Sequence, residues 1–129
     1  RSVRGTETVL LVEDDARVRE LAARVLESCG YRVLAAGDGL EALQIGLVQH
    51  KDPIHLLLTD VVLPQMSGPE MAEQLQSAQP EIQVLYMSGY TDNAIVRHGA
   101  LAPGIAFLPK PFTIDDLTER VREVLDEGS

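Results

Sequence analysis

The chain has 129 residues, of which 45% are hydrophobic and 24% are charged, enough for one soluble globular domain with a packed core. Its net charge of −9 argues against a nucleic-acid-binding surface, which would need clustered Lys and Arg. No apolar run approaches the roughly 20 residues of a membrane helix and no signal peptide is visible, so we expect a cytoplasmic domain without membrane contact.

The beginning of the chain predicts a tail, a strand and a helix. Residues 1–7 are polar and are expected to form a tail or a linker, and the start at Arg1 rather than Met suggests a piece of a longer protein that could carry a membrane anchor elsewhere. The apolar run 9–12 predicts a buried strand. A helix that ends near Gly30 follows, and its inward stripe is expected to be Val18, Leu21, Ala22, Val25 and Leu26. The single Cys29 excludes an internal disulfide, fits a reducing compartment and is expected to be a buried thiol.

The middle of the chain alternates between strands and helices. Residues 32–36 predict a second strand at the edge of a sheet, and residues 40–48 predict a helix that ends before Pro53. The chain is organised around the stretch 55–64. Its three consecutive leucines have no polar alternation, which predicts a strand buried on both faces that ends at Asp60.

The second half continues this alternation. A helix is expected to begin at residues 67–69 and to end before Pro80. Residues 82–87 and 105–108 predict the fourth and fifth strands. Between these strands Asp92 could cap a short helix. The remaining expectations are a buried stripe of Met71, Ala72 and Leu75, apolar residues Ala94, Ile95 and Val96 in the short helix, and a last helix capped by Thr113 with Ile114, Leu117, Val121, Val124 and Leu125 inward.

This order of elements predicts the fold class. Five strands that alternate with five helices imply a parallel sheet with right-handed crossovers and helices on both faces. We therefore expect an α/β three-layer sandwich in which residues 8–127 form one domain and residues 128–129 a short tail. The sequence shows no internal repeat and no second domain.

Polar groups follow four of the five predicted strands at the point where each strand ends. They are the Glu13-Asp14 pair, Asp60, Ser88 and Lys110. Because the carboxyl ends of parallel strands lie on one edge of a sheet, these groups can converge there. Each residue alone could be a turn residue, a cap or a solvated charge, but their coincidence at four strand ends favours a functional site.

The chemistry of this set is that of phosphoryl transfer. Crowded carboxylates repel one another, which raises at least one pKa, and a hard cation such as Mg²⁺ or Mn²⁺ relieves that repulsion. Asp60 could act as a nucleophile that forms an acyl phosphate, with Lys110 and the metal neutralising the phosphoryl oxygens and Ser88 donating a hydrogen bond to one of them. No Cys/His cluster exists for zinc, since His50, His55 and His98 are scattered and are interpreted as ordinary surface or strand-end residues.

Over nearly its whole length the chain resembles a response-regulator receiver domain of two-component signalling. The matching segments are VLLVEDD from Val9, LLLTDVVLP from Leu56, Met66-Ser67-Gly68, VLYMSGY from Val84 and FLPKPF from Phe107. Their order and spacing are more specific than any one of them. The resemblance implies a flavodoxin-like sheet with strand order 2-1-3-4-5.

The same resemblance implies residue roles. Asp60 would take a phosphoryl group from a phosphohistidine of a histidine kinase or a histidine phosphotransfer domain. Glu13, Asp14, Asp60 and the backbone carbonyl of Val62 would hold the metal. The peptide bond before Pro111 would be cis. Phosphorylation would change the surface formed by the fourth helix, the fifth strand and the fifth helix, where a downstream protein or a second copy could bind.

The residues that flank these motifs indicate which receiver domains the chain is most similar to. RGTETVLLVEDD from Arg4 and MSGYTDNAIVRHG from Met87 are similar to the C-terminal receiver of hybrid sensor histidine kinases. A stand-alone single-domain response regulator is the alternative. The domain itself would catalyse only its own phosphorylation and dephosphorylation, whereas a parent chain could be a histidine kinase.

Four positions are notable in comparison with common family usage. Phe107 stands at the switch aromatic, where it could either swing inward against Ser88 or be a plain core residue. Ser88 stands where Thr is common and keeps the hydroxyl. Val62 and Tyr90 lie two residues past Asp60 and Ser88, where family members position water, and neither side chain orients a hydrolytic water well. We therefore expect slow self-dephosphorylation.

Two alternative functions are disfavoured by particular residues of the sequence. A flavin-binding flavodoxin-like protein would need phosphate-cradling Ser, Thr or Gly after the first strand, which has acids instead. A phosphatase with an aspartyl nucleophile would want a second acid at position 62. The segment 37–42 matches G-x-G-x-x-A, but Asp38 and Glu41 would face a pyrophosphate, so a turn and helix start is the better interpretation.

Overall fold

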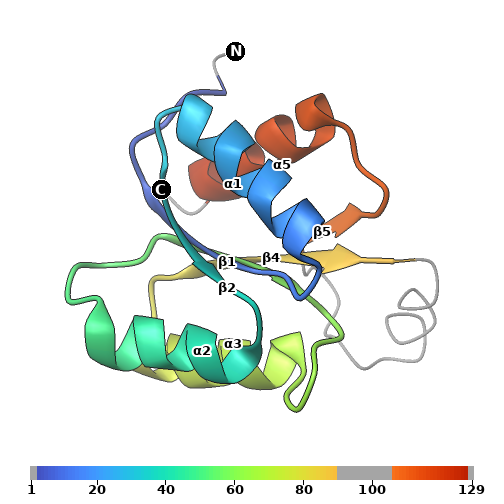
Figure 1. Cartoon of the computed structure of the whole chain (residues 1–129). Helices are drawn as coiled ribbons and strands as arrows, with labels where there is room; N and C mark the ends of the chain where they lie inside the picture. The colour runs from blue at the N-terminus through green and yellow to red at the C-terminus, as the bar shows by residue number, and fades with distance from the viewer. Residues whose placement is uncertain (1–2, 90–105, 128–129) are drawn as a thin grey trace.

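The computed structural model describes residues 3–89 and 106–127, and these form a parallel five-stranded sheet between two layers of helices (Figure 1). The elements are β1 (Thr8–Val12), α1 (Ala16–Ser28), β2 (Arg32–Ala36), α2 (Gly39–Gln44), the π-helix η1 (Ile45–Gln49), β3 (Leu56–Asp60), α3 (Gly68–Ala78), β4 (Gln83–Ser88), β5 (Ala106–Pro109) and α5 (Ile114–Glu127). The strand order is β2-β1-β3-β4-β5, and every neighbouring pair is parallel. The predicted flavodoxin-like sheet is confirmed, including the edge position of β2.

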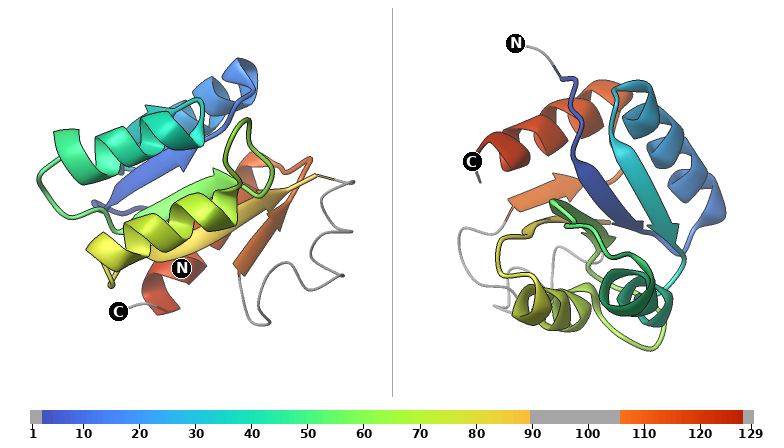
Figure 2. Two further views of the ribbon diagram at one scale, coloured as in Figure 1. Left: turned by 90° about the horizontal axis from the view of Figure 1, so that it is seen from below. Right: turned by 90° about the vertical axis from the view of Figure 1, so that its left-hand side faces the viewer.

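The helices cover both faces of the sheet, as Figure 2 shows in two views. Because side chains alternate along a strand, Val9 and Leu11 of β1 belong to the core beneath α1 and α5, whereas Leu10 and Val12 belong to the core beneath α2 and α3. β3 is buried along its whole length, as its unbroken apolar run predicts. The central strand therefore holds its last residue, Asp60, rigidly at the carboxyl edge of the sheet.

Two residues expected to face the core are exposed instead. Leu21 is 53% exposed because the buried stripe of α1 runs through Ala22 and Leu26, and Leu21 is turned about 100° away from Ala22. Ile114 is 57% exposed because it is the first residue of α5, one turn ahead of Leu117, where the core begins. Both positions fit a helical period, but the period alone says neither how wide the buried face of the helix is, as for Leu21, nor how far along the helix it extends, as for Ile114.

The segment expected as one helix over 40–48 is divided. α2 ends at Gln44 and η1 continues to Gln49 with wider helical turns. A Cβ on Gly46 would lie 2.5 Å from Cδ2 of Leu75, so the glycine lets this segment pack closely against α3. The short helix expected around residues 94–96, with its cap Asp92, lies outside the described residues. Cys29 is the C-cap residue of α1 and packs half-buried against the core, rather than fully buried as expected.

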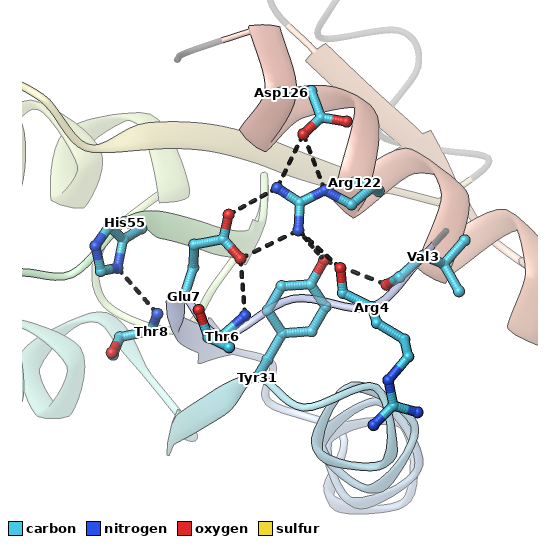
Figure 3. Close-up of polar contacts among 9 residues, drawn as sticks. All are labelled: Val3, Arg4, Thr6, Glu7, Thr8, Tyr31, His55, Arg122 and Asp126. Atoms are coloured by element: carbon cyan, nitrogen blue, oxygen red, sulfur yellow. Dashed lines mark hydrogen bonds and ion pairs between the residues drawn. The ribbon is translucent and has the colours of Figure 1, made fainter. Parts of the chain in front are cut away.

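Residues 3–7 form an arm that lies against α1, β2 and α5 (Figure 3). Arg122 of α5 is its main anchor, because its Nη2 lies 2.7 Å from Oε2 of Glu7 and its Nη1 donates to the carbonyl of Arg4 at 3.1 Å. The same guanidinium donates to the hydroxyl of Tyr31 and pairs with Asp126. The polar segment before β1 is therefore fixed to the domain and contributes to its stability.

Replacing Glu7 with Gln should lower the free energy of unfolding by about 1–2 kcal/mol near neutral pH, because the charged hydrogen bonds with Arg122 are lost. The hydrogen bond from Arg122 holds the pKa of Glu7 below 4.5, so this stabilisation is present above pH 4.5 and disappears as the pH falls through the lowered value. Urea unfolding at neutral and at acidic pH measures both effects. Glu20→Gln, an exposed acid on α1, is the control and should change stability by less than about 0.5 kcal/mol.

Candidate functional site

Four strands deliver polar groups to one point on the carboxyl edge of the sheet. Glu13 directly follows β1, Asp60 and Ser88 end β3 and β4, and Lys110 follows β5. The ladder aligns Asp60 with Met87 and Ser88 with Pro109, and the amide of Lys110 donates to the carbonyl of Ser88 at 2.8 Å. The strand ends are thus held in register where the sequence predicted that the polar groups converge.

Lys110 joins the two buried carboxylates. Its Nζ lies 2.5 Å from Oε1 of Glu13 and 2.6 Å from Oδ1 of Asp60. Asp60 is 3% exposed and Glu13 is 1% exposed, so both acids are removed from water and rely on this cation and on each other. The second oxygen of Glu13 accepts from the amide of Asp15 at 3.0 Å.

The pKa values of the two buried carboxylates are shifted in opposite directions. Burial, and then the neighbouring Glu13, raise the pKa of Asp60 to about 8. Burial also opposes the charged form of Glu13, but the bonds from Asp60 and Lys110 outweigh it and lower the pKa of Glu13. Burial likewise works against Lys110, and its two acidic partners raise its pKa nonetheless. One carboxylate pKa is raised, as expected, and it is that of Asp60, but burial contributes more to the rise than the neighbouring acid does.

Asp14 completes a cluster of three acids. One oxygen from each of Glu13, Asp14 and Asp60 lies within 4.8 Å of the others, and Asp14 is exposed at the mouth of the cluster. Oxygen donors of this number and charge suit a hard divalent cation that keeps several waters. Asp15 does not join them: its Oδ1 caps α1 by accepting from the amide of Arg17 at 2.9 Å.

The remaining predicted site residues are placed as follows. Ser88 is buried and its Oγ donates to the carbonyl of Gly89 at 3.4 Å. Phe107 is half-buried and packs in the core beneath α2 and α3, with its ring 6.1 Å from that of Tyr86. Val62 is 49% exposed, and Tyr90 lies outside the described residues. The predicted cis peptide bond between Lys110 and Pro111 is confirmed.

Two residues with a structural effect on the site were missed by the sequence reasoning. Gly68 was interpreted as part of a helix start and of a segment that matches the receiver family, yet its close packing was not foreseen: a Cβ there would lie 2.1 Å from the backbone oxygen of Asp60. Arg19 donates from Nη1 to the carbonyl of Glu13 at 2.7 Å. A buried glycine next to the acid motif could have signalled the first, whereas nothing in the sequence distinguishes Arg19 from the other arginines of α1.

The family described as the response regulator receiver domain matches residues 9–122. The chain belongs to this family. The match covers the five strands except Thr8 and reaches well into α5, so it includes all four strand ends that carry the acidic and basic groups.

Relatives of this receiver domain include proteins of very different length. Sensor kinase CckA of Brucella abortus (strain 2308) is 38% identical over 123 residues, which cover 95% of this chain and 13% of the relative. The response regulator receiver protein CpdR of the same organism is 30% identical over 117 residues, which cover 91% of this chain and 95% of the relative. The crystal structure of the receiver domain from hybrid histidine kinase CckA matches with a TM-score of 0.75 and 36% identity, covering 92% of this chain and 98% of that one.

These findings place the chain among receiver domains of two-component systems, as its motifs predicted. In the part of the chain that the structure describes, no helix combines the length and apolar character needed to cross a membrane.

Proposed function

We propose that Asp60 is the phosphoacceptor of a phosphorelay. An oxygen of Asp60 would attack the phosphorus of a phosphohistidine, the P–N bond would break, and the electron pair would return to the imidazole nitrogen. The observation that supports this most directly is the burial of Asp60 at the edge of the sheet, between Lys110 and two further acids.

Glu13, Asp14 and Asp60 are proposed to hold Mg²⁺ or Mn²⁺, with the backbone carbonyl of Val62 as a further ligand. Their oxygens fit a hard cation in number, charge and spacing. A bound divalent cation would favour the ionised form of Asp60 and offset the charge on the transferred phosphoryl group. Burial and the neighbouring Glu13 raise the pKa of Asp60, and a divalent cation bound beside it would oppose that rise.

Lys110 and Ser88 would contact the phosphoryl oxygens. Lys110 has its Nζ next to Asp60 already, and Ser88 ends the neighbouring strand. Phe107 is the proposed switch aromatic, since it lies on β5 next to the surface that the fourth helix, β5 and α5 would present. Through that surface the phosphorylated domain would bind a downstream protein or a second copy.

The parent protein is proposed to be a cytoplasmic or membrane-anchored hybrid histidine kinase whose receiver lies in the cytoplasm. The 38% identity with a much longer sensor kinase supports this origin. The alternative is a stand-alone response regulator, which the nearly full-length match to CpdR favours. In either case the phosphodonor would be a histidine kinase or a histidine phosphotransfer domain.

Phosphorylation by acetyl phosphate should require Mg²⁺, and Asp14→Asn should raise the Mg²⁺ concentration that the reaction needs, because one of the three carboxylate ligands is lost. Intact mass measured with and without Mg²⁺, over a titration of the metal, reports the result. Asp115→Asn, an exposed acid on α5, is the matched control and should behave as wild type. Equal phosphorylation of wild type with and without Mg²⁺ would overturn the metal assignment.

The phosphorylated protein is expected to lose its phosphoryl group slowly. The aliphatic side chain of Val62 cannot orient a hydrolytic water, and it is exposed where that water would approach. After removal of the phosphodonor, the adduct mass should persist for minutes or longer. A lifetime of seconds contradicts the expectation, and Val62→Asn, which supplies an amide at this position, should shorten the lifetime.

A further inference from the structure

The loop after β1 carries two of the three acids of the site, and its conformation decides where they lie. Besides the bond from Lys110, three hydrogen bonds hold its first residue, Glu13. The amide of Glu13 donates to the carbonyl of Ala36 at 3.1 Å, and Oε2 of Glu13 accepts from the amide of Asp15 at 3.0 Å. The third bond goes to the carbonyl of Glu13, which accepts from Nη1 of Arg19 at 2.7 Å.

Arg19 reaches this carbonyl from the second turn of α1. Its own amide donates to the carbonyl of Asp15, the N-cap residue, so its backbone is fixed to the start of the helix. Its guanidinium also packs against the end of β2, because a Cβ on Gly37 would lie 3.2 Å from Nη1. Arg19 therefore links the loop after β1 to the loop after β2, and it is half-buried between them.

We propose that Arg19 is a positioning residue of the cation site: by holding the carbonyl of Glu13, it fixes Glu13 and Asp14 in the arrangement that binds the divalent ion. The inference rests on the proposed function, since it concerns the same metal. Arg19 bonds to a neutral carbonyl rather than to one of the carboxylates, so its guanidinium does not compete with the ion for the oxygens of Glu13, Asp14 and Asp60.

Replacing Arg19 removes both a positive charge and a hydrogen bond, and these two losses would change the Mg²⁺ affinity in opposite directions. A positive side chain close to a cation site disfavours the cation, so removing the charge alone would tighten Mg²⁺ binding. Losing the hydrogen bond would loosen the loop and weaken binding. Replacing a residue that orients metal ligands typically lowers metal affinity about 10–100-fold. We expect about tenfold for Arg19→Gln, because Glu13 keeps its bonds with Ala36, Asp15 and Lys110.

The test is the Mg²⁺ affinity of the folded, unphosphorylated protein, measured by calorimetric titration in wild type, Arg19→Gln, Arg19→Lys and Arg17→Gln. Arg17 is exposed on the same helix, so Arg17→Gln removes an equal charge and should leave the affinity unchanged or slightly higher. Arg19→Lys keeps one donor and should recover part of the affinity. Phosphorylation of Arg19→Gln by acetyl phosphate should approach the wild-type rate at saturating Mg²⁺.

An affinity of Arg19→Gln equal to or higher than that of wild type would overturn the inference, as would a loss that Arg17→Gln reproduces. A wild type that binds Mg²⁺ but takes no phosphoryl group would instead refute the phosphoacceptor proposal and leave the role of Arg19 standing. Melting temperatures without Mg²⁺ should be similar in all four proteins, which separates positioning of the ligands from a general loss of stability.

Discussion

Asp60→Asn is expected to abolish phosphorylation of the protein by acetyl phosphate and by any phosphohistidine donor. The amide lacks the nucleophilic oxygen, and Glu13, the other described carboxylate against Lys110, is assigned to the metal rather than to the phosphoryl group. Intact mass after incubation with acetyl phosphate and Mg²⁺ should show one phosphoryl group on wild type and none on the variant.

The variant should remain folded, so loss of reaction can be assigned to chemistry. Asn has nearly the same shape as Asp, and the raised pKa of Asp60 shows that the buried position already disfavours a negative charge. Circular dichroism should be unchanged. Asp15→Asn is the matched control, since Asn also caps a helix well, and it should be phosphorylated as wild type is. An adduct on Asp60→Asn of the same extent as on wild type would contradict the assignment.

Gly68→Ala should destabilise the protein by roughly 3 kcal/mol, at the upper end of what overpacking of a core usually costs. The added Cβ would lie 2.1 Å from the backbone oxygen of Asp60 and 3.3 Å from Cα of Val61, so backbone must move rather than a flexible side chain. The amide of Gly68 also donates to the carbonyl of Val61 at 2.8 Å, which fixes α3 close to the end of β3. Urea unfolding measures the loss.

A second buried glycine is the control for this substitution. A Cβ on Gly39 would lie 3.2 Å from the side chain of Met66, which is unbranched and can move aside. Gly39→Ala at the start of α2 should therefore cost less than about 1 kcal/mol. If both variants lose the same stability, the contact between Gly68 and the backbone of Asp60 is not the cause. Because that contact adjoins Asp60, Gly68→Ala should also slow phosphorylation.

The sheet could be predicted because each strand has its own apolar pattern in the sequence. The convergence of the acidic and basic groups could be predicted because each group directly follows one of these strands. The leucine run before Asp60 is apolar on both faces, and parallel strands bring their carboxyl ends to one edge. The order of the strands came from the resemblance to receiver domains rather than from periodicity. The buried faces of the helices were predicted less well, since Leu21 and Ile114 were expected in the core and are exposed. The apolar period does not mark the limits of the buried face.

The contribution of Arg19 could not be predicted, and the only sign of that of Gly68 was a glycine close to the acid motif, because each residue acts on the backbone of a different segment. Arg19 holds a carbonyl at the end of β1, and Gly68 allows α3 to approach the end of β3. Backbone contacts of this kind leave no pattern in side-chain chemistry. The division of the helix over residues 40–48 into α2 and η1 has the same origin, since the packing of Gly46 against Leu75 depends on α3.

The position of the phosphoryl group on the chain tests the central claim most directly. Protein loaded from acetyl phosphate with Mg²⁺ can be reduced with borohydride, which converts an aspartyl phosphate to homoserine, and the modified residue can then be mapped by peptide sequencing in the mass spectrometer. The site described here predicts a single modification at Asp60. Modification at Glu13 or Asp14, or no modification of a wild type that binds Mg²⁺, would contradict it.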